Sequence, residues 1–215
     1  MAALFCLASA CREFADQPDI QDTAVNKIAS CSPEVSTVSI DLDEDGTGDL
    51  LFDAYNYDNA SIGSKDRGIF LNRTSAQYKV ELLFVPVSPG YVLNSSYLLG
   101  RVDKGTSIGP GTTYEGVSWR DIEYGGNFNN NKHLIWDVYI PTVGFWYFNT
   151  LTQNSSVVET YIAFRYKSSG GGTFRYGWIR IRDERVPGED VQRIRVVDMA
   201  RATIPGTPVM AGVYL

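Results

Sequence analysis

The chain has 215 residues, a formal net charge of −6 and a hydrophobic content of 44%, which suits one folded domain with a sizeable core. Aromatic residues make up 13% of the chain and Gly is abundant, a composition that favours β-strands and tight turns. The acidic balance argues against a nucleic-acid-binding protein, because such proteins present a basic face to the phosphates.

The first eleven residues, MAALFCLASAC, are small and apolar and end at Cys11. They resemble the end of a bacterial lipoprotein signal, which predicts that residues 1–11 are a signal remnant and that Cys11 carries a lipid. The alternatives are a plain secretory signal and an ordinary N-terminal segment. In an oxidising compartment Cys11 could instead pair with Cys31.

Residues 12–34 are polar with scattered acids, and Pro18 interrupts them. This composition predicts a tether, with one or two helical turns between Thr23 and Ile28. The pattern then changes to short alternating runs separated by Gly, Pro, Asn and Ser, which predicts a single β-sandwich domain over residues 35–215.

Eleven strands are predicted within this domain. Without a long amphipathic helix between them, they indicate an all-β, two-sheet antiparallel sandwich that is jelly-roll-like. Residues 103–116 are rich in turn formers, and we expect a surface loop there. The predicted strands cover residues 35–40, 50–55, 68–71, 78–85, 97–102, 117–124, 134–140, 145–148, 157–166, 174–182 and 192–199.

The segments Tyr161–Lys167 and Phe174–Arg182 flank a Gly-rich turn, which predicts a hairpin. Along the returning strand, aromatic and then cationic residues alternate with residues that become aliphatic after Gly177. Because successive side chains of a strand point to opposite faces, the two faces of this hairpin should differ in chemistry.

Between Ile28 and Ser64 the chain has eight acids and no Lys or Arg. The central stretch reads DLDEDGTGD and has the spacing D-x-D-x-D-G. Oxygen ligands at alternate positions of a tight loop, with Gly at the backbone reversal, are what Ca²⁺ requires. The sequence therefore predicts a Ca²⁺ site, whose expected ligands are the carboxylates of Asp41, Asp43, Asp45 and Asp49 and the carbonyl oxygen of Thr47.

The twelfth position of this loop is Phe52, where helical Ca²⁺-binding loops place a bidentate Glu. The apolar run that starts at Leu50 therefore indicates a strand after the loop, and Asp53 could be a sixth ligand only if that strand bends. The alternative is a solvated acidic turn, neutralised by a basic residue from a distant part of the chain. In either case we expect a structural role rather than catalysis.

Four features follow one another in a set order along the chain. They are the acidic loop Ile40–Asp49, the segment Gly105–Gly109, the pair Tyr161–Arg165 and Tyr176–Arg180 (YIAFR and YGWIR), and the segment Ile204–Gly212 (IPGTPVMAG). In this order they resemble a group of secreted and surface β-sandwich proteins, frequent in Bacteroidetes, whose biochemistry is unassigned. The resemblance implies a sandwich fold and a surface location, and it supplies no catalytic residue.

Asp121 and Glu123 lie two residues apart, beside Trp119, so both should project from one face of a strand. A retaining glycosidase needs two carboxyl groups about 5–5.5 Å apart in a sugar-binding cleft. A glycan hydrolase that uses this pair is therefore an alternative function, and an outward-facing strand edge is the simpler explanation. The single histidine, His133, has no Gly-x-Ser-x-Gly motif to accompany it.

Trp136, Tyr139, Trp146 and Trp119 are candidate ligand-binding residues, because exposed aromatic side chains bind glycans or protein partners. Their alternative role is core packing. Taken together, the sequence favours a protein that is secreted or lipid-anchored at the bacterial outer membrane or cell surface and that binds or assembles without turnover. A structural subunit of a surface complex or filament is a further alternative.

Overall fold

The computed structural model describes residues 20–31, 34–86, 97–112, 117–122, 133–140, 144–149, 159–184 and 193–213, with the backbone alone over 85–86, 97–98, 133–140 and 144–149. These residues form fourteen strands and no helix, so the predicted all-β class is confirmed. Within this part of the chain, no helix is long and apolar enough to cross a membrane.

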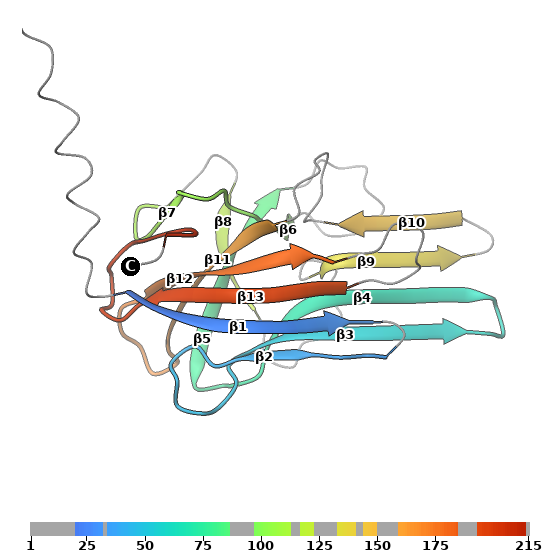
Figure 1. Cartoon of the computed structure of the whole chain (residues 1–215), viewed down its shortest axis with the longest axis horizontal. Coiled ribbons are helices and arrows are strands. Elements are labelled where there is room, and N and C mark those ends of the chain that lie inside the picture. The colour runs from blue at the N-terminus through green and yellow to red at the C-terminus, as the bar shows by residue number, and fades with distance from the viewer. Residues whose placement is uncertain are drawn as a thin grey trace, which may run out of the picture.

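Two antiparallel sheets form the predicted sandwich (Figure 1). The larger, seven-stranded sheet has the order β1-β13-β12-β11-β5-β6, and β8 also pairs with β5. Its strands are β1 (Ile20–Ser30), β13 (Arg193–Ala202), β12 (Arg175–Asp183), β11 (Glu159–Ser168), β5 (Tyr78–Pro86), β6 (Tyr97–Leu99) and β8 (Ser118–Asp121). The five-stranded sheet has the order β10 (Gly144–Asn149), β9 (His133–Ile140), β4 (Ser64–Arg73), β3 (Leu50–Asn59) and β2 (Val38–Ile40).

The main core lies between the two sheets. Phe52 and Leu71 enter it from the five-stranded sheet, and Leu82, Phe164 and Ile179 enter it from the seven-stranded sheet. All five are buried, and each buried side chain of this size contributes about 1.5–3 kcal/mol to stability. The alternation of apolar and polar residues in the predicted strands is what directs these side chains to one face.

A second core covers the outer face of the seven-stranded sheet. The short strands β7 (Ser107–Ile108) and β14 (Val209–Met210) pair with each other, and Ile108 and Val209 pack in one cluster with Trp178 and Tyr161. The rings of Tyr161 and Trp178 meet edge to face, with centroids 5.5 Å apart. The larger sheet is therefore covered on part of its outer face as well as on its inner face. The predicted surface loop at 103–116 is wrong in this part, because Ile108 is fully buried.

Three of the four features quoted for the resemblance meet in this second core. They supply Ile108 of the 105–109 segment, Tyr161 and Trp178 of the paired strands, and Ala211 of the 204–212 segment. The glycine of the YGWIR segment, Gly177, is required by close packing, because a Cβ there would lie 2.6 Å from the carbonyl oxygen of Ala200. These segments thus have a packing role.

The hairpin prediction is confirmed, because β11 and β12 pair antiparallel from Glu159↔Arg182 to Tyr166↔Arg175. Its two faces differ as expected. Ile179 and Ile181 lie in the core between the sheets, whereas Tyr176 and Trp178 lie in the second core.

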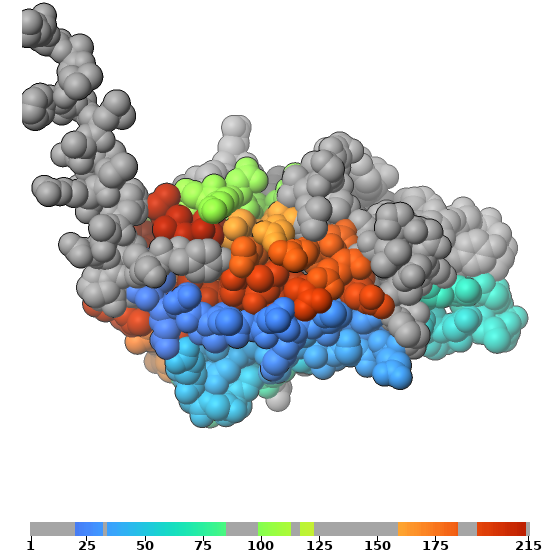
Figure 2. Space-filling model, viewed as in Figure 1, coloured from blue at the N-terminus to red at the C-terminus, as the bar shows by residue number. Residues whose placement is uncertain are grey.

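The predicted tether over residues 12–34 is wrong from residue 20 onward. Strand β1 pairs with β13 from Ile20↔Ala202 to Ser30↔Arg193, and no helical turn occurs at 23–28. The register shifts between Ala24 and Lys27, where Asn26 has a positive φ of 46°. In Figure 2, β1 (dark blue) lies on the surface beside β13 (orange-red). A polar sequence can form such an edge strand, because its backbone hydrogen bonds to β13 do not depend on side-chain pattern.

Cys11 and the rest of residues 1–19 lie outside the described residues. Lipidation of Cys11 and its pairing with Cys31 therefore stay predictions. Cys31 itself follows β1 directly and is fully buried in the main core.

Candidate functional site

The acid loop, residues 41–49, connects β2 to β3 and is fixed to the sandwich at both ends. The Asp49 N–H donates to the carbonyl oxygen of Ile40 at 2.8 Å, and the Thr74 N–H donates to the carbonyl oxygen of Asp49 at 2.9 Å. Leu42 is fully buried in the main core. Because Leu42 points inward, its neighbours Asp41 and Asp43 are turned to the other side of the chain, where Asp49 also lies.

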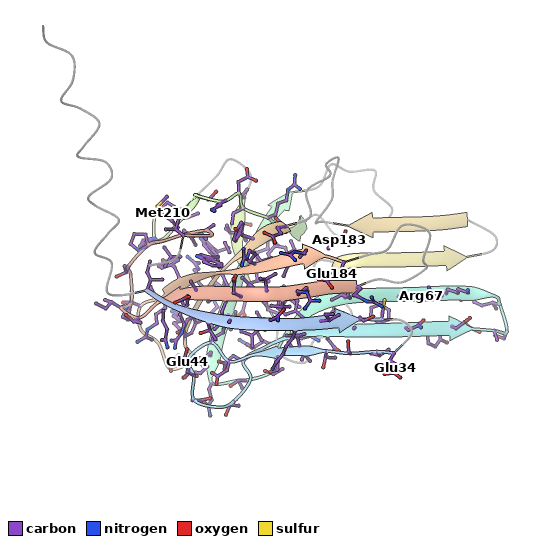
Figure 3. The ribbon with its side chains drawn as sticks, viewed as in Figure 1. Glu34, Glu44, Arg67, Asp183, Glu184 and Met210 are labelled. Atoms are coloured by element: carbon purple, nitrogen blue, oxygen red, sulfur yellow. The ribbon has the colours of Figure 1, made fainter. Side chains whose placement is uncertain are left out.

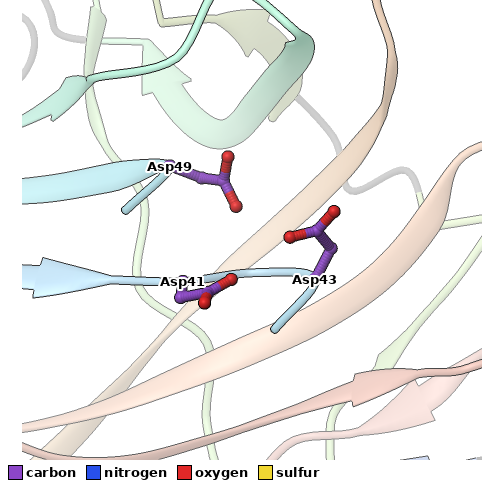
Figure 4. A group of neighbouring side chains, drawn as sticks. All are labelled: Asp41, Asp43 and Asp49. Carbon is purple, nitrogen blue, oxygen red and sulfur yellow. The ribbon is translucent and has the colours of Figure 1, made fainter. Parts of the chain in front are cut away.

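Three carboxylates of the acid loop converge (Figure 4). One oxygen each of Asp41, Asp43 and Asp49 lies within 4.8 Å of the others. Ca²⁺ binds oxygen at about 2.4 Å, so two ligands on opposite sides of the ion lie about 4.8 Å apart. The three oxygens are therefore close enough together to share one ion of this size. Asp49 is only 1% exposed, so it forms the buried side of the site.

The charges in this site repel one another. The pKa of Asp49 is raised to about 6, mainly by burial. The neighbouring carboxylates of Asp43, Asp41 and Asp45 contribute to this rise, and the hydrogen bond from the Leu42 N–H acts against it. Asp43 behaves differently. Burial acts to raise its pKa, but hydrogen bonds from Tyr78 and from the backbone of Asp45 outweigh this effect, so the pKa lies below its ordinary value. The same hydrogen bond raises the pKa of Tyr78 to about 12.

A basic residue, Arg201, reaches the acid loop. It forms its ion pair with Glu44, although its charge also acts to lower the pKa of Asp43. Figure 3 labels Glu44 on the acid loop. Arg201 of β13 lies 3.7 Å from Glu44 Oε1, and Gln21 and Thr23 of β1 donate to the same carboxylate. Glu44 has a positive φ of 65°, and these contacts offset the strain of that backbone conformation. Among the residues that the structure describes, no Lys or Arg forms an ion pair with Asp41, Asp43 or Asp49.

The other predicted ligands have different positions. Asp45 is outside the group of three, and its Oδ1 accepts the Thr47 N–H at 2.7 Å, so these two residues shape the turn together with Gly46, whose φ is +89°. Asp53 lies on β3, which continues without a bend to Asn59, and its Oδ2 accepts a hydrogen bond from Asn72 at 3.4 Å. Of the predicted set, the structure brings together Asp41, Asp43 and Asp49.

A second buried carboxylate lies on the outer face of the larger sheet, at Glu81. Lys79 Nζ lies 2.6 Å from its Oε1, and Arg165 Nε donates to its Oε2 at 2.7 Å. Burial acts to raise the pKa of Glu81, but the hydrogen bonds and charges of Lys79 and Arg165 outweigh it and hold the pKa below its ordinary value. This carboxylate has its counter-charges within the chain.

Aromatic rings surround these cations. The Arg165 guanidinium lies 4.8 Å from the ring centroid of Trp119 and 4.2 Å from that of Phe174, and Lys167 Nζ lies 4.7 Å from Phe174. Trp119, a predicted ligand-binding residue, is half-buried, and its ring also meets that of Tyr176 edge to face at 6.1 Å. We call Lys79, Glu81, Trp119, Arg165, Lys167 and Phe174 the cation–aromatic cluster.

The remaining predicted ligand-binding residues lie on β9 and β10. Position 136 is opposite Phe148 and Gly68, and position 146 is opposite Val138. Because alternate residues of a strand share a face, positions 136 and 146 belong to one face of the five-stranded sheet and position 139 to the other. The predicted aromatic set is therefore divided between two faces of one sheet, with Trp119 on the other sheet.

The predicted hydrolase pair is only half described. Asp121 on β8 is exposed and lies 3.4 Å from Arg73 Nη1, and Glu123 lies outside the described residues. Arg73 thus supplies a counter-charge to Asp121. Catalysis by Asp121 and Glu123 stays a prediction.

Arg201 and Arg165 have functional-site contacts that were not predicted from the sequence. Arg201 could have been noticed in the sequence, because it is a cation between two alanines, Ala200 and Ala202. All three residues are buried in β13. Arg165 occurs inside the YIAFR segment, yet its contacts with Glu81, Trp119 and Phe174 join residues far apart in the chain. Spacing along the sequence cannot reveal such contacts.

Comparison of the chain with protein-family models, with curated proteins and with solved structures found no match in any of the three. The acid loop and the cation–aromatic cluster are therefore interpreted from their own geometry.

Proposed function

We propose that the protein is a non-catalytic binding or assembly module of the bacterial cell surface, and that its acid loop holds a Ca²⁺ ion that stabilises the sandwich. The ion would be bound by Asp41, Asp43 and Asp49 and would fix the connection between β2 and β3. Its role is structural, because the site lies on a turn that is anchored in the main core by Leu42.

One observation carries the proposal: Asp49 is buried against two other carboxylates without an ion pair among the described residues. Burying an unpaired charge is costly, and clustering three of the same sign adds repulsion. A divalent cation removes both costs at once. The converging carboxylate oxygens are hard ligands, which Ca²⁺ prefers. Softer metals prefer nitrogen and sulfur ligands.

The experiment is thermal unfolding of the full chain in Ca²⁺ and in a chelator. A ligand that binds only the folded state stabilises it by about 2.7 kcal/mol at a hundredfold excess over its dissociation constant, so we expect chelation to lower the Tm by several degrees. Asp43→Asn should reduce this difference, whereas Asp45→Asn, which removes the same charge outside the group of three, should leave most of it. Equal Tm values in both buffers, with no Ca²⁺ found by elemental analysis, would reject the ion.

The surface location depends on the N-terminus and is tested separately. A lipid on Cys11 would attach the sandwich to a membrane through the residues that precede β1. Mass spectrometry of the protein from its native membrane should then show a chain that begins at a lipidated Cys11. A chain that begins at an unmodified Met1 would remove the anchor from the proposal and leave the Ca²⁺ site untouched.

A further inference from the structure

The cation–aromatic cluster has more positive than negative charge. Lys79, Arg165 and Lys167 contribute three positive charges and Glu81 contributes one negative charge, a surplus of two. Asp121 lies opposite Glu81 on β8, but it is paired with Arg73 and leaves this surplus unchanged. The surplus is unusual in a chain whose net charge is −6.

Two of these cations face each other. Lys79 and Lys167 are direct cross-strand partners in the pairing of β5 with β11. Like charges directly opposite each other repel. Glu81 offsets this repulsion from the side of Lys79, whose Nζ lies 2.6 Å from Glu81 Oε1, and Lys167 contacts the ring of Phe174. The Lys79 side chain is 39% exposed and Lys167 is half-buried, so an anion from solvent can reach both. An anionic group between them would turn the repulsion into attraction.

We propose that the cation–aromatic cluster binds an acidic polysaccharide, whose carboxylate or sulfate groups lie between Lys79 and Lys167 and whose sugar rings contact Phe174 and Trp119. The inference rests on the proposed binding role of the protein, but it does not depend on the Ca²⁺ ion. The half-buried rings of Phe174 and Trp119 supply apolar contact next to the charges.

An acidic peptide fits this surface less well. Extended peptides gain affinity by adding a strand to a sheet edge, where the backbone groups are free. Four members of the cluster lie on β5 and β11, each of which already pairs with strands on both sides, whereas Trp119 lies on β8, which pairs with β5 alone. Recognition of an anion between Lys79 and Lys167 therefore uses side chains, and a polymer in which charged groups alternate with sugar rings matches cations that lie beside aromatic rings.

The test measures binding of the full chain to four polymers in buffer that contains a chelator. Polygalacturonate carries carboxylates, dextran sulfate carries sulfates, neutral dextran is the uncharged control, and poly-glutamate is the acidic peptide. We expect binding to one or both acidic polysaccharides, none to dextran, and weaker binding to poly-glutamate. Binding should fall as NaCl rises from about 0.05 M to about 0.5 M, because salt screens exposed charges.

Variants then locate the surface. Lys167→Gln and Lys79→Gln should each weaken polysaccharide binding about tenfold, as loss of one charge-assisted contact does. Lys65→Gln is the matched control, because Lys65 is an exposed lysine on β4 of the other sheet. Lys167→Gln should also leave the Tm unchanged or slightly raised, since it relieves the opposed charges, so weaker binding could not be attributed to unfolding.

Three results would overturn the inference. They are no binding to either acidic polysaccharide, equal loss of binding in Lys65→Gln, and tighter binding to poly-glutamate than to the polysaccharides. Each is distinct from failure of the Ca²⁺ site, which would show only as an unchanged Tm on chelation.

Discussion

Asp49 and Glu81 are both carboxylates buried in the same sandwich, 1% and 5% exposed, yet their surroundings are opposite. Glu81 has Lys79 and Arg165 against it, and its pKa is lowered. Asp49 has other aspartates against it, and its pKa is raised to about 6. Burial is therefore the same in the two places, and only the sign of the neighbouring charge differs.

The two carboxylates differ in where their counter-charge comes from. At Glu81 the fold supplies the cations itself, so the carboxylate needs nothing from outside. At Asp49 the available cation, Arg201, is directed to Glu44 instead. The fold thus neutralises one buried acid, whereas Asp41, Asp43 and Asp49 have no ion pair with a Lys or Arg among the described residues, and this contrast is what the proposed Ca²⁺ ion would account for.

The largest expected effect comes from removing the counter-charged acid. Glu81→Gln should lower the free energy of unfolding by about 2 kcal/mol at pH 7, because it leaves Arg165 and Lys79 without their carboxylate. Urea unfolding measures this loss. Glu34→Gln, a change at an exposed position, should stay within about 0.5 kcal/mol of the wild type. Equal stability of Glu81→Gln and wild type would mean that the ion pairs of Glu81 with Lys79 and Arg165 contribute little to the free energy of unfolding.

The stability difference between wild type and Glu81→Gln should also depend on pH. Because the folded-state pKa of Glu81 is lowered, its stabilising contribution is present above the unfolded value of about 4.5 and is lost as the pH falls through the lower folded value. The stability difference between wild type and Glu81→Gln should therefore be constant from pH 7 to about pH 5 and shrink below it. A difference that persists at pH 3 would contradict this assignment.

An intermediate effect, and one that changes sign, is expected at Asp49. In chelator, Asp49→Asn should raise stability by about 1 kcal/mol, since it removes a buried repelled charge while the amide oxygen can still accept the Leu42 N–H. In Ca²⁺ the wild type should be the more stable protein. Paired urea unfolding curves in the two buffers test this reversal. The same ranking in both buffers would argue against a bound cation.

The smallest effect is expected at the junction between the acid loop and β1. Glu44→Gln keeps a hydrogen-bond acceptor for Thr23 but loses its charge toward Arg201, so we expect a loss of about 0.5 kcal/mol. Hydrogen exchange should become faster at the backbone amides of residues 20–24. Unchanged exchange would show that the backbone pairing with β13 alone holds this end of β1.

Most of the fold could be predicted from the sequence, because it depends on local pattern. The eleven predicted strands all occur, with ends shifted by a few residues. Strand β1 could not be predicted in this way, since IQDTAVNKIAS has little apolar alternation and is held by its backbone pairing with distant β13. Strands β7 and β14 have two residues each, too few for a period to show.

The acid loop was predictable for a similar reason: alternate aspartates before a glycine are a local signal. Which of them converge was not, because this depends on the burial of Leu42 and on the position of β3 after the turn. Arg201 is 152 residues from Asp49 in the chain, and Tyr78 reaches Asp43 from another strand. Electrostatic partners of this kind are set by topology and not by spacing.

The pairing of β7 with β14 has a consequence for the order of assembly. Residues 204–213 are synthesised after every strand on which they pack, so during translation the second core around Trp178 lacks Val209 and Ala211 until this segment emerges. A nascent chain halted before residue 204 would expose a broad aromatic face to chaperones and to other copies of itself. Strand β14 therefore completes the cover of an apolar face that would otherwise be open to association between copies.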